Sequence, residues 1–560
     1  MNKKWWKEAV VYQIYPRSFM DTNGDGIGDL QGIISKLDYI KDLGIDVIWI
    51  CPMYKSPNDD NGYDISDYQN IMDEFGTMDD FDQLLEEVHN RGMKLIIDLV
   101  INHTSDEHPW FIESRSSRGN AKRDWYIWRD GKDGGPPNNW ESIFSGSVWE
   151  FDENTDQYYM HIFSTKQPDL NWKNPEVRRA LYDMVNWWLD KGIDGFRVDA
   201  ISHINKEYGL KDMPNPKGLK YVHSFDKHLN VKGIHKYLQE LKEETFSKYD
   251  IMTVGEANGV KVENKEDLEE WIGEEKGKFN MVFQFEHLGL WEAGKNEKLD
   301  IVALKATLSK WQKALENKGW NALFIENHDQ PRRVSTWGDD KKYWYESATA
   351  LASMYFLMQG TPFIYQGQEI GMTNVKFNSI EEYNDVADKN MYRYKREEGV
   401  SHKEIMELIW ASSRDNSRTP MQWTKEQNAG FTIGTPWLGV NENYKSINVE
   451  KQLQDERSIL HFYKKMITLK KKNEVFTYGT YHLILDDHPQ VSAYTRTLDN
   501  DKVVVFSNLT DEVATWKKGL NFSVNSNQLL LANYDVSNHV STNRLILEPF
   551  ETRVYRVNSK

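Results

Sequence analysis

The sequence contains a single cysteine, Cys51, so the chain cannot form an internal disulfide. It also lacks any run of apolar residues long enough to cross a bilayer. The N-terminal segment MNKKWWKEAVVYQIYP has neither the apolar stretch nor the small-residue cleavage site of a secretory leader. Because an unpaired cysteine suits a reducing compartment, we predict a cytoplasmic protein with no membrane partner.

Basic residues are outnumbered: 69 Lys and Arg stand against 86 Asp and Glu, giving a net charge of −17. No basic stripe of the kind that binds a polyanion is present, so we expect no nucleic-acid partner. Nothing indicates a large permanent assembly, and we expect a monomer or a weak homo-oligomer. Aromatic residues are abundant, with 21 Trp, 28 Tyr and 23 Phe, and they supply both core and flat faces on which sugar rings stack.

Eight short runs of β-branched and aromatic residues alternate with amphipathic stretches. Each run is almost continuously apolar, as in strands that are buried on both faces. Such alternation predicts parallel βαβ units, and eight of them favour an α/β fold of the closed (β/α)8, or TIM-barrel, type. The predicted strands are Val10–Ile14, Val47–Cys51, Lys94–Leu99, Gly195–Val198, Ile251–Val254, Met281–Phe285, Ala322–Ile325 and Thr361–Tyr365.

Three intervals depart from this alternation. Residues 104–172 are rich in Trp, Gly and Asn and predict a small domain inserted after the third strand, while residues 371–410 predict a charged helical insertion. Beyond residue 478, alternating strands separated by Asp and Asn turns predict an antiparallel β-sandwich. The predicted domains are the barrel in two parts (1–103 and 173–478), the inserted domain (104–172) and the C-terminal sandwich (479–560).

Charged and polar residues gather where the predicted strands end, and in such barrels catalytic groups lie at that face. A single Asp in such a loop is most simply a helix cap, but carboxylates on four different strands at one mouth favour a site. Converging carboxylates suit either a hard metal ion or attack on an acetal carbon. The residues concerned are Asp98, His103, Arg197, Asp199, Glu256, His328 and Asp329.

Asp199 and Glu256 end neighbouring strands, which suits the two carboxyl groups of a retaining glycosidase, about 5–5.5 Å apart. Arg197 lies two residues before Asp199 on the same face and is predicted to keep it ionised by charge pairing. An apolar strand and nearby carboxylates are predicted to raise the pKa of Glu256, as a general acid requires. We therefore predict Asp199 as nucleophile and Glu256 as general acid/base.

Four segments closely resemble the signature regions of the α-amylase superfamily: Asp98–His103, Gly195–Ala200, Gly255–Ala257 and Glu326–Asp329. The QPDLN segment, Gln167–Asn171, resembles a fifth region found in its oligo-1,6-glucosidase/α-glucosidase group. The resemblance covers essentially the whole chain. It implies that Asp329 stabilises the transition state by gripping the 2- and 3-hydroxyls of the sugar, and that Asp98 supports the site.

The resemblance also implies a pocket for one terminal glucose of a small oligosaccharide. Asp60 and Arg418 resemble the pair that closes around the non-reducing glucose, which implies release of single glucoses from a chain end. Tyr63 is expected to stack beneath the ring, and Arg197 to orient the nucleophile. His103 and His328 are expected to donate hydrogen bonds to the sugar, and the other expected substrate contacts are Phe144, Phe163, Gln167 and Ala200.

Linkage preference is predicted from Ala200, which follows the nucleophile. The resemblance implies valine here in oligo-1,6-glucosidases and a smaller or more polar residue in enzymes that act on α-1,4 bonds. A small side chain leaves room for the closer ring of an α-1,4-linked sugar, so maltose is the predicted substrate and α-1,6 linkages are the alternative. Trehalose-6-phosphate hydrolase and sucrose isomerase are weaker alternatives, as is a non-catalytic subunit that would lack the carboxylates.

A second motif predicts a structural metal. Residues 21–29 place oxygen-bearing groups at alternate positions, as in the first part of an EF-hand loop, with Gly26 at the turn. Position 12 is Gly32, so the bidentate glutamate is missing, and the loop is predicted to hold Ca²⁺ or Mg²⁺ without taking part in chemistry. No organic cofactor is expected. The predicted ligands are Asp21, Asn23, Asp25, the carbonyl of Ile27, and Asp29.

Overall fold

The computed structural model describes residues 3–207, 209–295, 298–516, 524, 526–536 and 545–557. Its centre is a ring of eight parallel strands in the order β13-β12-β10-β5-β2-β1-β15-β14. A parallel bridge between Val282 of β13 and Asn321, just before β14, joins the two ends of the ring. The predicted (β/α)8 barrel is therefore confirmed. Its strands are β1 (Val11–Ile14), β2 (Val47–Ile50), β5 (Lys94–Val100), β10 (Gly195–Asp199), β12 (Met252–Glu256), β13 (Met281–Phe283), β14 (Ala322–Leu323) and β15 (Thr361–Tyr365).

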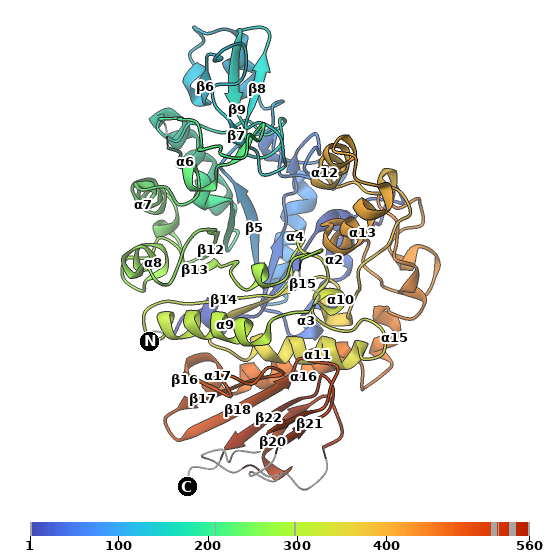
Figure 1. Ribbon diagram of the computed structural model, residues 1–560. Coiled ribbons are helices and arrows are strands. Elements are labelled where there is room, and N and C mark those ends of the chain that lie inside the picture. Colours follow the sequence, from blue (N-terminus) through green and yellow to red (C-terminus); the bar gives the residue numbers. More distant parts are fainter. Residues whose placement is uncertain are drawn as a thin grey trace.

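Helices cover the outside of the ring (Figure 1). Local sequence signals fix their ends: Thr77 and Asp80 form a reciprocal capping box at the start of α4, and Gly44 ends α3 with φ 100°. The stretch at residues 30–43 forms two helices, because the hydroxyl of Ser35 bonds back to the carbonyl of Gly32 and Lys36 leaves the helical conformation. The helices are α2 (Leu30–Ser35), α3 (Leu37–Leu43), α4 (Met78–Asn90), α6 (Pro175–Asp190), α7 (Ile234–Glu244), α8 (Lys265–Ile272), α9 (Ile301–Leu315) and α11 (Trp344–Phe356).

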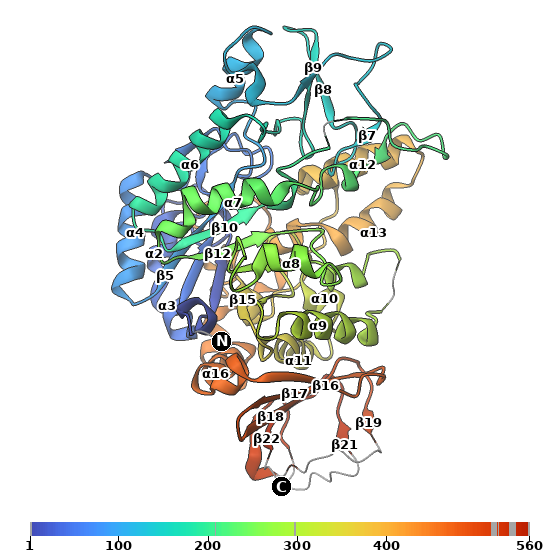
Figure 2. The ribbon, with the colours of Figure 1, turned by 90° about the vertical axis from the view of Figure 1, so that its left-hand side faces the viewer.

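The segment after β5 forms a separate lobe at one end of the barrel (Figures 1 and 2). It contains α5 (Pro109–Ser116) and an antiparallel sheet of β6 (Trp128–Arg129), β9 (Gln157–Met160) and β8 (Trp149–Asp152). A short strand in it, β7 (Trp140–Glu141), pairs with β11 (Val222–His223) from the loop after β10. This pairing ties the lobe to the barrel at the end where the parallel strands finish.

The segment after β15 adds α12 (Val386–Glu397) and α13 (His402–Ser412). Figure 1 shows α12 at the same end of the barrel as the inserted lobe. The side-chain amide of Asn390 donates to the carbonyl of Phe144 at 3.3 Å, so this insertion touches the lobe directly. The two insertions together surround the mouth of the barrel.

An antiparallel unit follows α16 (Ile459–Lys472) at the opposite end of the barrel (Figure 2). A five-stranded sheet faces the pair β19 (Ala514–Trp516) and β21 (Leu545–Leu547), with Phe506, Leu547 and Tyr555 in a shared apolar cluster. Residues 517–523, 525, 537–544 and 558–560 of the predicted sandwich lie outside the described residues. The sheet consists of β16 (Thr480–Ile484), β17 (Val491–Leu498), β18 (Asp501–Asn508), β22 (Thr552–Val557) and β20 (Leu529–Ala532). In the part of the chain that the structure describes, no helix is both long and apolar enough to span a membrane.

Candidate active site

A cavity of about 470 Å³ opens at the mouth of the barrel. Strand ends form its floor, the inserted lobe contributes Ile143, Phe144 and Phe163, and the loop after β10 contributes one wall. Of the residues predicted from sequence, those lining this cavity are Asp60, Tyr63, His103, Phe144, Phe163, Asp199, Ala200, Glu256 and Asp329. The structure thus gathers most of the predicted site into one place.

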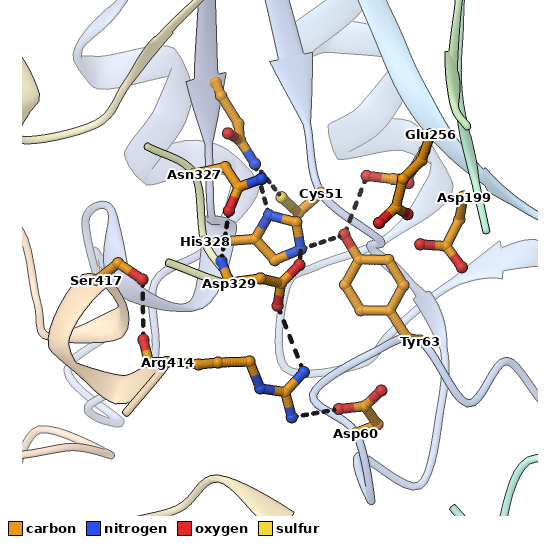
Figure 3. Close-up of polar contacts among 12 residues, drawn as sticks. Cys51, Asp60, Tyr63, Asp199, Glu256, Asn327, His328, Asp329, Arg414 and Ser417 are labelled. Atoms are coloured by element: carbon orange, nitrogen blue, oxygen red, sulfur yellow. Dashed lines mark hydrogen bonds and ion pairs between the residues drawn. The ribbon is translucent and has the colours of Figure 1, made fainter. Parts of the chain in front are cut away.

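Arg197 is the centre of the charged floor. It lies on β10 between β5 and β12, directly opposite Asp98 in one strand and Val254 in the other. Its Nη1 lies 2.6 Å from Asp98 Oδ1 and 2.8 Å from Asp199 Oδ1, and its Nη2 lies 2.6 Å from Glu256 Oε2. Because one guanidinium binds both carboxylates, Asp199 and Glu256 are held next to each other. Figure 3 shows these two carboxylates side by side.

Ala200 adopts a left-handed conformation with φ 43°, which is uncommon for a residue with a side chain. In this conformation its N–H donates to Glu256 Oε2 at 3.0 Å. Glu256 therefore has two donors, from Arg197 and from the backbone of Ala200. The unusual turn immediately after Asp199 thus helps to fix the second carboxylate.

Asp199 lies in a buried and highly charged environment. Burial raises its pKa well above the usual range; the Arg197 guanidinium opposes this effect, and the Glu256 and Asp98 carboxylates add to it. Arg197 thus favours the ionised form of Asp199, as predicted from sequence, but its single charge is shared among three carboxylates and does not outweigh burial.

Asp329 is strongly held in the ionised form. Burial opposes its charge, but His328, Arg418 and Arg414 outweigh burial and hold the pKa of Asp329 well below its usual range. Asp329 Oδ2 lies 2.9 Å from His328 Nε2, and Oδ1 lies 2.7 Å from Arg418 Nη2. In turn, although burial lowers the pKa of His328, the Asp329 carboxylate raises it to about 10. Asp329 is therefore an ionised carboxylate whose charge is balanced by its basic neighbours.

The predicted Asp60–Arg418 pair is corrected by the structure. The guanidinium beside Asp60 is that of Arg414, with Nη2 3.1 Å from Asp60 Oδ1. Arg418 is fully buried behind the cavity, where it binds Asp329 and the carbonyl of His328. Arg414 and Arg418 are four residues apart on one helical turn, α14 (Asp415–Arg418) and its N-cap, so sequence spacing could not separate them.

Sequence reasoning also missed Asp385, which holds Arg414 in place. Asp385 is buried and accepts from Arg414 Nε at 2.8 Å, while it also caps α12. The Arg414 guanidinium lies 5.0 Å from the centre of the Phe144 ring. The sequence pattern around Asp385 signals only a helix cap, since its second partner lies far along the chain. Other lining residues missed from sequence are His203, Phe225, Leu229, Asn258, Gly259, Phe285 and Gln330.

His103 is neutral in this site, because burial lowers its pKa to about 3. Its Nε2 lies 3.0 Å from the carbonyl of Tyr63 and 3.1 Å from Gln167 Nε2. Gln167 also donates to Asp60 Oδ2 at 3.2 Å. The QPDLN segment thus links His103 to the Asp60 end of the cavity. Asp98 is completely buried and accepts from Trp49 Nε1 at 2.9 Å, away from the cavity.

In the predicted metal loop, the acidic side chains accept hydrogen bonds from the backbone of the loop itself and of the helix that follows. Asp21 accepts hydrogen bonds from the backbone of Asn23, Gly24 and Gly26 at 2.8–2.9 Å, and Asp29 accepts from Gly32 at the start of α2. At Gly26, a Cβ would lie 1.8 Å from the carbonyl oxygen of Thr435, so only glycine fits. Within the described residues, no group of three or more His, Cys, Asp or Glu is arranged to hold an ion.

Buried carboxylates around one cavity at the mouth of a (β/α)8 barrel fit the requirements of a glycoside hydrolase, and the family match places the chain in that class of enzyme. The chain belongs to the α-amylase family, glycoside hydrolase family 13: residues 13–479 match its alpha amylase catalytic domain. The resemblance seen in the sequence is confirmed.

Individual relatives cover the whole chain. A probable oligo-1,6-glucosidase of Bacillus subtilis is 61% identical, over 99% of this chain and 100% of its own length. An oligo-1,6-glucosidase of Parageobacillus thermoglucosidasius is 55% identical over 100% of both chains. Among solved structures, the trehalose-6-phosphate hydrolase of Bacillus licheniformis is 46% identical with a TM-score of 0.91, again over 100% of both chains.

Proposed function

We propose that the chain is a retaining α-glucosidase in which Asp199 is the nucleophile and Glu256 the general acid/base. The observation that carries this proposal is the Arg197 guanidinium, which binds both carboxylates at the mouth of the barrel. Asp199 attacks the anomeric carbon while Glu256 gives its proton to the departing oxygen. Glu256 then takes a proton from the water that releases the glucose, so the sugar keeps its α configuration.

Asp199 has to be ionised, and Glu256 has to carry the proton that it gives to the departing oxygen, when the reaction starts. Burial raises the pKa of Asp199, and the Arg197 guanidinium opposes this effect. Arg197 and the N–H of Ala200 both donate to Glu256 and fix its position beside the nucleophile.

Asp60 and Arg414 are proposed to close the pocket behind the terminal glucose. Asp60 is buried and Arg414 is half-buried on the side of Asp329, and Arg414 is held by Asp385 and covered by Phe144. A chain extended beyond the first glucose would have to displace this ion pair, which is costly when its partners are buried. The proposed action is therefore removal of single glucoses. Asp329, His103, His328 and Tyr63 are proposed to hold the ring of that glucose.

The relatives favour the alternative linkage, α-1,6, over the α-1,4 linkage that was predicted from sequence. Two full-length relatives, at 61% and 55% identity, are named oligo-1,6-glucosidase, and we propose α-1,6-linked oligosaccharides as the main substrates. Ala200 supports a second activity, because its small side chain lines the cavity next to the nucleophile and leaves room for an α-1,4-linked sugar. We propose that isomaltose and maltose are both cleaved.

The ratio of kcat/KM for isomaltose and maltose tests the linkage proposal. Ala200→Val should lower kcat/KM for maltose and leave kcat/KM for isomaltose unchanged. The loss on maltose should correspond to about 1–3 kcal/mol, as expected for one or two methyl groups in a pocket. Valine at φ 43° also strains the backbone, so isomaltose turnover in the same variant is the internal control. A wild-type enzyme inactive on isomaltose would overturn the main proposal, and one inactive on maltose would overturn the second.

Two activities of related enzymes are not proposed. Sucrose isomerases typically carry an RLDRD-type segment after the seventh strand, and this chain has PRRVSTWGDD at residues 331–340. Trehalose 6-phosphate needs a cation for its phosphate. Among the described residues, Arg414 is the one Lys or Arg lining the cavity, and it is already bound to Asp60 and Asp385.

We propose separately that the loop at residues 21–29 binds Ca²⁺ or Mg²⁺, with oxygens from Asp21, Asn23, Asp25, Ile27 and Asp29. Hard cations prefer such oxygen ligands, and an ion would share the Asp21 and Asp29 oxygens with the N–H groups that they now accept from. Because the ion would bind the folded state only, EDTA should lower the melting temperature and leave activity at low temperature intact. In Asp21→Ala, added Ca²⁺ should no longer raise the melting temperature. A wild-type melting temperature that changes neither with EDTA nor with added Ca²⁺ would exclude the proposed metal site.

A further inference from the structure

The His328 imidazole is held between two aromatic rings. Tyr63 stacks on one face with 5.3 Å between ring centres and 5° between planes, and Tyr15 stacks on the other at 5.9 Å and 21°. The side chain is completely buried. The ring therefore cannot turn about its Cβ–Cγ bond. What the surroundings still decide is which ring nitrogens carry protons and which groups those protons meet.

One edge of the ring faces the cavity. Nε2 lies 2.9 Å from Asp329 Oδ2 and 2.7 Å from the hydroxyl of Tyr63 (Figure 3). Asp329 can only accept when ionised, so Nε2 must carry a proton in order to bond to it. This hydrogen bond holds one carboxylate oxygen of Asp329, while Arg418 holds the other.

The opposite edge faces Gln13, a polar residue in the middle of the apolar strand β1 that is 1% exposed. The terminal amide of Gln13 lies 2.7 Å from His328 Nδ1 and 3.3 Å from Cys51 Sγ. An amide can bond to either form of the ring, since its nitrogen donates to an unprotonated Nδ1 and its oxygen accepts from a protonated one. Burial lowers the pKa of His328, but the Asp329 carboxylate raises it to about 10, so both ring nitrogens carry a proton at neutral pH, and Nδ1–H donates to the amide oxygen.

We propose that Gln13 is a positioning residue that acts through His328 on Asp329. By accepting from Nδ1–H, the Gln13 amide stabilises the protonated ring and keeps Nε2–H directed at Asp329. This inference rests on the proposed role of Asp329 in holding the sugar, and it adds a residue from β1 that does not itself line the cavity.

The test compares Gln13→Met, Gln13→Glu and a matched control, Gln312→Met. Gln312 on α9 is also 1% exposed and also hydrogen-bonds through its amide, to Gln359, but it lies away from His328. Gln13→Met should lower kcat/KM by about tenfold, the size expected for one buried hydrogen bond, mainly through kcat. Gln312→Met should leave kcat/KM unchanged.

Nitrogen NMR of ¹⁵N-histidine-labelled enzyme separates positioning from packing. The His328 signals are those missing from His328→Asn. In the wild type, both ring nitrogens should be protonated at neutral pH; in Gln13→Glu, the carboxylate is a stronger acceptor and should shift the Nδ1 signal; and in Gln13→Met, loss of the acceptor should shift it the opposite way. Unchanged His328 signals in the folded Gln13 variants would overturn the proposal, whatever the loss of activity. If wild-type enzyme cleaves no α-glucoside, the proposed function fails, while the NMR result on Gln13 still stands.

Discussion

Asp199→Asn should fold normally and lose at least about 10⁴ in kcat on isomaltose and maltose, the order of loss seen when a covalent nucleophile is removed. A neutral amide cannot form the glycosyl-enzyme on which retention depends. Folding should survive, because Arg197 keeps two carboxylate partners, Asp98 and Glu256, and its charge stays compensated. Circular dichroism and the melting temperature check the fold, and steady-state kinetics checks the loss.

Asp194→Asn is the matched control for this variant. Asp194 immediately precedes the same strand, but its partners are His89 and Lys94, away from the cavity. The control should keep wild-type kcat and KM. Product stereochemistry gives an independent check, since retention requires that α-glucose appears first in the NMR spectrum. Near-wild-type turnover by Asp199→Asn, or early β-glucose, would remove Asp199 from the mechanism.

The part of the site that was predictable from sequence is the part fixed by barrel topology. Asp98, Asp199 and Glu256 each lie at the end of a buried parallel strand, and neighbouring strands end at the same edge. Once the strands are recognised, their last residues must converge. The apolar runs that define the strands are also the strongest signal in the sequence. Fold and catalytic floor were therefore predicted together.

The predictions that failed concern residues on loops and residues that share one charged partner. Arg414 and Arg418 lie on the same turn, and only the path of the chain after β15 decides which of them reaches Asp60. The raised pKa of Asp199 was not predicted, because sequence shows the arginine two residues away but not the burial of Asp199 or the other carboxylates that share this arginine. Gln13 did give a signal, as a polar residue within an apolar strand, but its partner lies more than three hundred residues away.

Glu256→Gln should separate the two chemical steps. Without a general acid, kcat on isomaltose and maltose should fall by about 10²–10⁴. 4-Nitrophenyl α-glucoside should be affected much less in its first step, because nitrophenolate leaves without a proton. Azide should then accelerate turnover of this substrate and give the α-glucosyl azide, since an anionic nucleophile needs no general base. Equal losses on all substrates, with no effect of azide, would assign Glu256 another role.

The pH dependence of Glu256→Gln shows whether the Glu256 carboxylate raises or lowers the pKa of Asp199. Burial raises the pKa of Asp199, and the Glu256 carboxylate adds to this, so removing that charge should lower the Asp199 pKa toward its ordinary value. Asp199 acts in its ionised form, and activity is lost as pH falls through its pKa. The acid limb of the kcat/KM profile on 4-nitrophenyl α-glucoside should therefore move to lower pH in Glu256→Gln. An acid limb that stays in place would mean that the Glu256 carboxylate does not raise the pKa of Asp199, against the contacts that both groups make with Arg197.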